Sequence, residues 1–316
     1  MRKVLVLFGK SNWENKVPFN DRGRQYSYEL FYSLCKQGGI QMYRASYQWY
    51  DYKKNIFRHA WTYEDNQWKR VHDIIPDIIY DKTRSHAESS CKKESIGMHY
   101  SFINDLHFTR IIDDKFLSSL LFQEWSKKSI LVRNPTELQK NISEITTEKV
   151  VLKPINESGG KGIQIFEKEN VKDISFSGEH IIQDFIDSSH GVPNISSKMH
   201  DFRIILVNDA IIYAYIREPK SGSFLANLAQ GGSLRIIHNK DIPQSVRPII
   251  DRAQSIFSSF QPKIYTIDIM FDKNRFPWIV ELNSMPGLYF TPEERPSMEK
   301  MYHALLAVFQ EKLSSL

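Results

Sequence analysis

Cysteine is almost absent from this chain of 316 residues, which contains only Cys35 and Cys91. Two cysteines cannot build the disulfide framework of a small secreted domain, so we interpret both as free thiols in a reducing compartment. Long apolar runs are absent too, since none reaches the roughly 18 residues that a membrane helix needs. The stretch VLVLF follows Met1-Arg2-Lys3 without a small-residue cleavage site. We therefore expect a soluble cytoplasmic protein.

The chain also lacks a long block of charge of one sign. Its 42 basic and 37 acidic residues are spread along the sequence and give a net charge of +5. This distribution favours small anionic ligands over nucleic acid, and no segment indicates a membrane partner.

Aromatic residues concentrate between Tyr43 and Trp68, among lysines and arginines. A base-stacking surface for nucleic acid is one interpretation of this segment. The residue pattern favours a packed β-hairpin instead, in which NIFRHAWTY and QWKRVHDII are joined by the turn EDN. A dimer surface and a wall of a substrate pocket are further alternatives, so a homodimer or homotetramer stays open.

The length predicts two or three packed lobes of mixed α/β (α+β) structure, because single hydrophobic cores stop growing near about 250 to 300 residues. Residues 1–108 begin with KVLVLFG, RGRQYSYELFYSLCKQGG and IQMYRAS, which predict a strand, an amphipathic helix and a second strand. The run PDIIYDKTRS predicts another buried strand. We expect a small α/β domain.

Basic residues follow two of these strands, namely Lys10, Lys82 and Arg84. Ligands of open α/β sheets bind beyond the carboxyl ends of the strands. We hypothesise that Lys82 and Arg84 bind a carboxylate of an amino-acid or peptide substrate. Solvated loop charges are the alternative.

Residues 109–186 predict a second α+β lobe. DDKFLSSLLFQEW has a helical pattern, and we expect its buried face to consist of Phe116, Leu117, Leu120 and Leu121. The stretch VVLKPINESGGKGIQIF places a glycine-rich loop with Lys161 between two strands, which indicates either a phosphate-binding loop or a flexible hairpin tip. It is not a Walker loop, because neither GKS nor GKT follows the glycines.

Residues 187–316 predict a third lobe, in which YTIDIMFD and FPWIVELN form an antiparallel hairpin. Asp268 lies in its first strand, and Glu281 and Asn283 share one face of the second. Two carboxylates and an amide suit Mg²⁺, or Mn²⁺, and carboxylates clustered among apolar neighbours would repel one another without a cation. Three unrelated polar residues on a solvated face are the alternative.

A magnesium site predicts a polyphosphate ligand and positive groups that face it. Lys115, Lys153 and Lys161 are candidate point charges. Arg203 and Arg217 lie on the strands that lead to the hairpin, and a guanidinium can hold an oxyanion with two hydrogen bonds.

Taken in order, these segments resemble the ATP-grasp superfamily, and within it the RimK-like and glutathione-synthetase-like carboxylate–amine ligases. The similarity extends from about Asp113 to Gly287. DDKFLSSLLF resembles the segment of the first nucleotide lysine, VVLKPINESGGKGI the strand and mobile loop of the second, and IIQDFI the hinge between two lobes. DFR, YIRE, FLANLAQGGS, DIMFD and VELNSMPG complete the pattern. The resemblance implies an N-terminal α/β lobe at 1–108, followed by two α+β lobes at 109–186 and 187–316 that clasp ATP.

The resemblance also implies roles for single residues. Asp268, Glu281 and Asn283 would bind the metal ion, and Arg203 and Arg217 would act in catalysis, with Arg217 at the acyl-phosphate intermediate. The nucleotide-binding residues that the resemblance implies are Lys115, Lys153, Ser158, Gly159, Gly160, Lys161, Gly162, Gln183, Asp184, Phe185, Ile186, Asp201 and Asn227.

The implied activity is ATP-dependent ligation of a carboxylate to an amine through an acyl phosphate, on an amino-acid or peptide substrate. Such a reaction needs ATP and Mg²⁺ but no side-chain nucleophile, which agrees with the lack of a convincing Ser-His or Cys-His arrangement. A catalytically inactive ATP-binding regulatory or scaffold protein of the same fold is the main alternative, and a nucleic-acid-binding module is a second.

Overall fold

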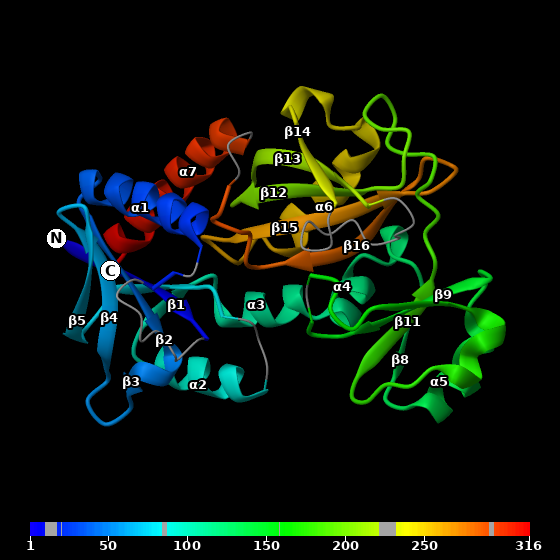
Figure 1. Cartoon of the computed structure of the whole chain (residues 1–316), viewed down its shortest axis with the longest axis horizontal. Helices are drawn as coiled ribbons and strands as arrows, with labels where there is room; N and C mark the ends of the chain where they lie inside the picture. The colour runs from blue at the N-terminus through cyan, green and yellow to red at the C-terminus, as the bar shows by residue number, and fades with distance from the viewer. Residues whose placement is uncertain (10–17, 20, 84–86, 158, 221–231, 291–293) are drawn as a thin grey trace.

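The computed structural model describes residues 1–9, 18–19, 21–83, 87–157, 159–220, 232–290 and 294–316, which form three β-sheets with helices around them (Figure 1). Among these residues, no helix is long and apolar enough to span a membrane. The first sheet belongs to the N-terminal third of the chain, the second to the middle, and the third to the C-terminal part.

The N-terminal sheet has the strand order β3-β4-β2-β1-β6-β7, and β5 pairs with β4. The strand β1 is parallel to β2 and β6, whereas β4 is antiparallel to its partners. Its strands are β1 (Arg2–Phe8), β2 (Ile40–Ser46), β3 (Tyr50–Asp51), β4 (Ile56–Glu64), β5 (Gln67–Ile74), β6 (Ile78–Asp81) and β7 (Ser101–Ile103). The associated helices are α1 (Arg22–Gln37), η1 (Tyr47–Trp49), α2 (Ala87–Gly97) and α3 (Leu106–Asp113).

The strand, helix and strand predicted at the start of the chain are confirmed as β1, α1 and β2. The carboxylate of Asp21 caps α1 by accepting from the backbone N–H of Arg24 at 2.7 Å. The helix ends at Gly38, whose N–H donates to the Leu34 carbonyl, and Gly39 follows with a φ of 83° that glycine adopts without steric cost.

The predicted aromatic hairpin is confirmed as β4 and β5. Its turn is shorter than EDN, because Glu64 still pairs with Gln67, and Asp65 and Asn66 both have positive φ, as a two-residue type I′ turn requires. Trp61 and Trp68 are buried in the core of the N-terminal sheet. The aromatic cluster is therefore in large part ordinary core packing.

The second sheet has the order β10-β9-β11-β8, with every pairing antiparallel. Its elements are α4 (Lys115–Leu121), η2 (Gln123–Trp125), β8 (Ser129–Val132), α5 (Pro135–Asn141), η3 (Ile142–Glu144), β9 (Lys149–Pro154), β10 (Gln164–Glu167), η4 (Lys168–Asp173) and β11 (His180–Asp184). The strands β9 and β10 flank the glycine loop.

The predicted buried face of α4 is correct only in part. Phe116 and Leu121 are half-buried, and Leu121 packs against the core of the third sheet. Leu117 and Leu120 are 39% and 47% exposed, while Lys115 and Ser118 are buried. The helix has only 7 residues, and Lys115 lies on its face toward β16. The spacing of the apolar residues therefore did not predict which face of the helix packs against the rest of the protein.

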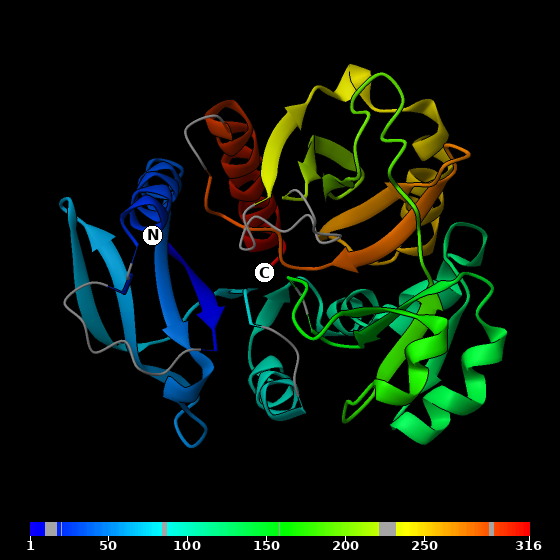
Figure 2. The same cartoon turned by 45° about the vertical axis from the view of Figure 1, so that its right-hand side comes forward.

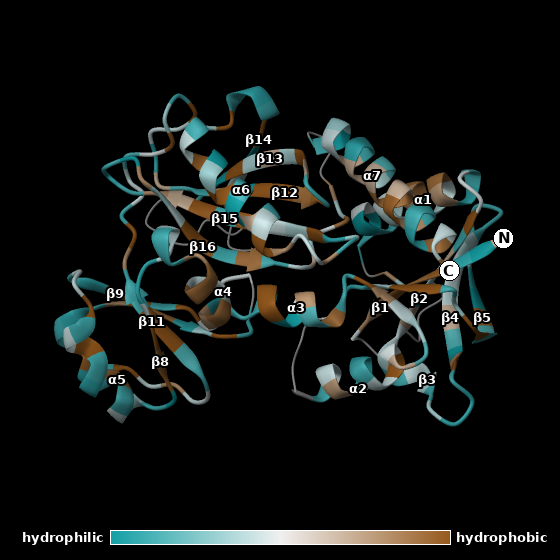
Figure 3. Ribbon diagram, turned by 180° about the vertical axis from the view of Figure 1, so that it is seen from behind, coloured by the Kyte–Doolittle hydropathy of each residue, from teal (hydrophilic) through white to brown (hydrophobic). Residues whose placement is uncertain are grey.

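The third sheet has the order β14-β13-β12-β15-β16 and is antiparallel throughout. Its elements are β12 (Asp201–Val207), β13 (Ala210–Glu218), β14 (Ser233–Ile237), η6 (Asn239–Asp241), η7 (Gln244–Val246), α6 (Arg247–Ile256), β15 (Ile264–Phe271) and β16 (Pro277–Asn283). Hydrophobic residues run along α3 and β12 (Figure 3), and both elements contribute to one core together with α6.

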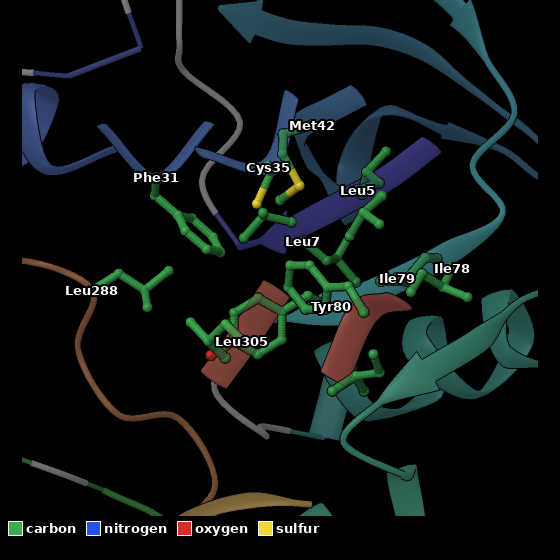
Figure 4. Packing of buried hydrophobic residues seen from close by; sticks show 14 of the residues in the cluster. Leu5, Leu7, Phe31, Cys35, Met42, Ile78, Ile79, Tyr80, Leu288 and Leu305 are labelled. Atoms are coloured by element: carbon green, nitrogen blue, oxygen red, sulfur yellow. The ribbon is translucent and has the colours of Figure 1, made fainter. Parts of the chain in front are cut away.

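The last helix, α7 (Arg295–Ser314), lies between α1 and the third sheet (Figure 2). Leu305 of α7 and Leu288 join Phe31 and Tyr80 in the core of the N-terminal sheet (Figure 4). The Tyr302 hydroxyl lies 2.9 Å from the Ser27 carbonyl oxygen of α1 and 2.9 Å from that of Leu288. The C-terminal end of the chain therefore packs against the first lobe.

Candidate functional site

A cavity of about 490 Å³ lies where residues of all three sheet regions meet. Its wall combines charged groups of the β15–β16 hairpin, the glycine loop and α4 with side chains of the N-terminal region. The lining residues are Arg24, Tyr28, Lys82, Asp113, Lys115, Asn156, Glu157, Gly159, Arg203, Arg217, Glu281, Asn283, Met285, Gly287, Leu288 and Tyr289.

The hairpin predicted from YTIDIMFD and FPWIVELN is confirmed as β15 and β16, whereas its metal-binding role stays a prediction. The register explains how the acidic residues meet. Asp268 pairs with Glu281 on one side and with Arg203 of β12 on the other. Glu281 and Asn283 are two residues apart on β16, and the Asn283 amide donates to Glu281 Oε1 at 3.2 Å. Glu281 and Asn283 line the cavity, whereas Asp268 is only 1% exposed and lies beneath it.

Both catalytic arginines predicted from the sequence form ion pairs with the buried carboxylates. Arg203 binds both oxygens of Asp268, with Nε 2.5 Å from Oδ1. Arg217 binds Asp201 and also donates to Asp268 Oδ2 at 3.1 Å. Each charge is thus compensated where β12, β13 and β15 lie side by side, which offsets the cost of removing it from water.

Asp201 keeps one oxygen for further contacts. Its Oδ1 atom has no hydrogen-bond partner among the described residues, although the side chain is buried. Burial raises the pKa of Asp201 to about 6, and the neighbouring Arg217 opposes this shift.

The two predicted nucleotide lysines reach β16 from the second lobe. Lys115 of α4 lies with Nζ 3.8 Å from Glu281 Oε2 and also donates to the Ile155 and Glu157 carbonyls. Lys153 of β9 donates to the Val280 carbonyl at 3.4 Å. Burial lowers the pKa of Lys153 to about 8, while Glu281 opposes the shift. Lys115, the two arginines and Glu281 therefore form one charged group at the cavity, whereas Lys153 contacts β16 outside the cavity lining.

The glycine loop covers one edge of this group. Gly159, Gly160 and Gly162 have φ values of 69°, 76° and 73°. Residues other than glycine rarely adopt this backbone conformation. Gly159 lines the cavity, whereas the Lys161 side chain is 74% exposed and its Nζ lies 3.7 Å from Glu157 Oε1. Ser158 lies outside the described residues.

The predicted hinge residues lie at the end of β11, away from the cavity lining. Gln183 donates to the Ser129 hydroxyl at 2.6 Å, and the Asp184 carboxylate accepts from the Thr146 N–H at 2.6 Å. The Phe185 N–H donates to Thr147 Oγ1 at 3.0 Å. The side chain of Asp184 thus holds the segment at Thr146 and Thr147, which precedes β9. The adenine-binding role of this segment, Ile186 included, stays a prediction.

Three further predicted residues cannot be placed. Asn227, Lys10 and Arg84 lie outside the described residues, so the nucleotide role of the first and the anion-binding role of the others stay predictions. Lys82, in contrast, lines the cavity, and its Nζ donates to the Pro286 carbonyl.

Sequence reasoning missed the contacts that hold the segment after β16. Asn104 donates to the Ile264 and Ser284 carbonyls at 2.7 and 2.9 Å, and the Asp113 carboxylate accepts from both the N–H and the hydroxyl of Ser284 at 2.8 Å. Burial raises the pKa of Asp113 to about 6, and the two Ser284 hydrogen bonds oppose this shift. These residues flank α3, so this helix positions the chain next to Asn283.

Sequence reasoning also missed Arg24, Tyr28 and Tyr289 as cavity residues. Their positions in an amphipathic helix and after a Pro-Gly pair gave no signal of a shared site, because only the packing of α1 against residues 285–289 brings them together.

The oxygen donors suit a hard divalent cation. Glu281 and Asn283 present a carboxylate and an amide to the cavity beside Asp268, and oxygen ligands are those that Mg²⁺ selects. Within the ranges that the structure describes, no group of three or more His, Cys, Asp or Glu side chains is arranged for a metal ion. A bound cation would therefore complete its coordination with Asn283 and with substrate or solvent oxygens.

Comparisons with known proteins define the class. The model of the RimK-like ATP-grasp domain matches residues 112–295, and the chain belongs to this family. A probable alpha-L-glutamate ligase of Enterobacter sp. (strain 638) is 30% identical over 166 residues, which cover 50% of each protein. The chain thus matches about half the length of this curated relative.

Solved structures extend the similarity to the whole fold. D-cycloserine synthetase is 13% identical, with a TM-score of 0.66 over 98% of this chain and 99% of that one. The D-alanine–D-alanine ligase of Bacillus anthracis, solved with ATP, is 13% identical, with a TM-score of 0.59 over 100% and 98%. The three-sheet architecture is therefore the ATP-grasp fold, as the resemblance implied.

Proposed function

We propose that this protein is an ATP-dependent ligase that joins a carboxylate to an amine through an acyl phosphate, on amino-acid or peptide substrates. The observation that carries the proposal is the single cavity at which Lys115, Arg203, Arg217, Glu281 and Asn283 meet. Such a set neutralises and orients a polyphosphate, which is most of what phosphoryl transfer asks of a protein.

In this proposal the second lobe holds the nucleotide. Lys115 and Lys153 bind phosphate oxygens, the loop from Ser158 to Gly162 covers them, and residues 183–186 bind adenine by their main chain. Asp201 and Asn227 complete the nucleotide contacts. The uncompensated oxygen of Asp201 and the cavity position of Gly159 support these assignments.

Asp268, Glu281 and Asn283 would hold Mg²⁺, or Mn²⁺, which supplies charge neutralisation for the transferring phosphate when bound. Because Arg203 pairs with Asp268, that carboxylate would share its charge between the arginine and the cation. Binding at Glu281 would also weaken its contact with Lys115 and leave the lysine to the phosphates.

The reaction has two steps. An oxygen of the substrate carboxylate attacks the terminal phosphorus of ATP, and ADP leaves. The amine then attacks the acyl carbon of the acyl phosphate, loses a proton and expels phosphate, so that an amide bond forms. Arg217 and Arg203 stabilise the negative charge that develops on the acyl and phosphoryl oxygens. Closure of the glycine loop excludes water, which would hydrolyse the acyl phosphate.

The test is ADP release by the purified protein with ATP and Mg²⁺, measured against pools of amino acids and short peptides, with mass spectrometry of the products. We expect release that depends on both a carboxylate and an amine, and a product whose mass equals their sum minus water. ATP binding without release for any pool would favour the inactive regulatory protein instead.

We also propose lobes at 1–108, 109–186 and 187–316, in which α7 belongs to the last lobe and packs against α1 of the first. We propose a cytoplasmic location without nucleic-acid or membrane partners, as a homodimer or homotetramer. The free thiols of buried Cys35 and exposed Cys91 support a reducing compartment.

A further inference from the structure

One side of the cavity has no part in the nucleotide and metal roles proposed above. It faces the N-terminal sheet and is formed by the first turns of α1, the residue after β6 and the segment after β16. Its residues are Arg24, Tyr28, Lys82, Met285, Leu288 and Tyr289. This surface, the N-terminal side of the cavity, is where a second molecule has room beside the nucleotide.

Neither positive side chain of this side forms a direct ion pair within the described part of the chain. Lys82 donates to the Pro286 carbonyl but has no carboxylate oxygen within 4.0 Å among those residues, and Arg24 has neither a hydrogen bond from its guanidinium nor an ion pair there. Asp113 acts on the charge of Lys82 without pairing with it directly, and its oxygens accept hydrogen bonds from Ser284. A half-buried lysine ammonium without a directly paired carboxylate is costly, so a bound anion would stabilise the arrangement.

The rest of this side is apolar and aromatic. Tyr28 and Leu288 are 7% and 2% exposed, and Tyr289 lies against the start of α1. A Cβ atom on Gly23 would lie 2.8 Å from Tyr289 Cε2, so this ring, which is 43% exposed, packs directly against the glycine. Such walls suit a carbon chain, which a free inorganic anion lacks.

We infer that Arg24 and Lys82 bind an oxyanion of the substrate that enters from the N-terminal side, in addition to the group of that substrate that reacts. The substrate class is therefore an organic acid with a second carboxylate or a phosphate, whose carbon chain lies between Tyr28 and Tyr289. This inference rests on the proposed ligase function and names a substrate class for it.

The experiment is a calorimetric titration of the protein saturated with ADP and Mg²⁺, which occupy the nucleotide side. The probes are succinate and glutarate, the monoamide of each, and inorganic phosphate. The variants are Arg24→Gln and Lys82→Gln, and the matched control is Arg22→Gln, an exposed arginine of the same helix that does not line the cavity. Arg24 is itself exposed, so its substitution leaves the core intact.

We expect one dicarboxylate to bind the wild-type protein and the Arg22→Gln control with equal affinity. Its affinity for each of the other two variants should be about tenfold or more lower, because a charge-assisted hydrogen bond is lost. The monoamide should bind the wild-type protein weakly as well. Equal affinity for dicarboxylate and monoamide, unchanged affinity in both variants, or no binding of either dicarboxylate would overturn the inference. Inorganic phosphate that binds as tightly as the dicarboxylates would overturn the assignment to an organic acid.

The binding result is independent of turnover. If no substrate pool triggers ADP release, the ligase proposal fails while the titration still reports on the anion site. Conversely, turnover of substrates with and without the second anionic group at the same kcat/KM would overturn the anion site and leave the ligase function intact.

Discussion

Glu281 is the residue at which the proposed metal and nucleotide sites meet. It pairs with Asp268 across the hairpin, accepts from Asn283, and lies within 4.0 Å of Lys115 and Arg203. One carboxylate thus balances two cations at the cavity wall, so the local charge depends strongly on it.

Replacing Glu281 by Gln removes this charge and keeps the volume. We expect ADP formation to fall by about 100-fold or more, because a metal ligand and the partner of Lys115 are lost together, while thermal unfolding changes little. Initial rates at increasing Mg²⁺ measure the effect. Glu299→Gln on the exposed face of α7 is the control, and a variant at Glu281 with wild-type turnover would contradict the metal assignment.

Lys82 makes substrate binding dependent on pH. Burial lowers the pKa of Lys82 to about 7, and Asp81 and Asp113 oppose this shift. Lys93 of α2, which faces Asp81 at 2.8 Å, reduces that opposition. In the free protein, Lys82 is therefore protonated below pH 7 and increasingly neutral above it. Since the inferred anion binds the protonated form, the substrate KM should rise about tenfold per pH unit above this value.

The KM of the anionic substrate, measured on both sides of neutrality, checks this expectation. In the Lys82→Gln variant the KM should be higher and should lose this pH dependence. A wild-type KM that stays constant through the same range would mean that Lys82 does not titrate on binding.

At the scale of elements, the glycine loop between β9 and β10 shows why particular positions need glycine. Gly162 combines a φ of 73° with close contact, since a Cβ atom there would lie 2.8 Å from Pro154 Cγ. Gly178 has a similar φ of 81° with nothing within 4 Å of the same position. Comparing substitutions at Gly162 and Gly178 therefore distinguishes the effect of the positive φ from the effect of the steric contact.

We expect Gly178→Ala to cost about 1 kcal/mol of unfolding free energy through its positive φ alone, and Gly162→Ala to cost more. Only Gly162→Ala should also raise the KM for ATP, because displacement of the loop moves Gly159 from the cavity. Denaturant unfolding measures the loss of stability, and initial rates at increasing ATP concentration measure the KM. An equal KM for ATP in both variants would show that the contact of Gly162 with Pro154 does not affect nucleotide binding.

Elements were the level at which sequence patterns were most informative. The periodicity of α1, the alternation in β4 and β5 and the hairpin of β15 and β16 are local properties, and all are confirmed. The short helix α4 shows the limit of such patterns, since Lys115 faces β16 and Leu117 faces outward. The orientation of a short helix is decided by its neighbours, which its own sequence does not contain.

At the scale of the whole molecule, α7 connects lobes that are far apart in sequence. Its Leu305 is fully buried in the N-terminal core, and Tyr302 contacts both α1 and the segment after β16. The wall of the cavity around Leu288 therefore depends on the packing of α7 against α1, at the other end of the chain.

Leu305→Ala should lower the free energy of unfolding by about 2–5 kcal/mol, because a cavity replaces a buried side chain. Leu316→Ala, at a residue that is 60% exposed, should change it by less than about 0.5 kcal/mol. Chemical denaturation of both variants measures the difference. Equal stability would show that α7 contributes little to the N-terminal core.

The sequence by itself determined many of the elements, but not α2, β7 or α3, and it determined the order of the motifs and the chemical types of the site residues, because periodicity and spacing are local properties of the chain. It led to Asp268, Glu281, Lys115, Arg203 and Arg217, of which the structure brings all but the buried Asp268 to the cavity wall. Only the tertiary structure decided that Arg24 and Lys82 share this cavity and that Asn104 and Asp113 hold Ser284. The contacts of Ser284 join residues more than 150 positions apart, and like the shared cavity they exist only because α1, α3 and α7 pack against the segment after β16.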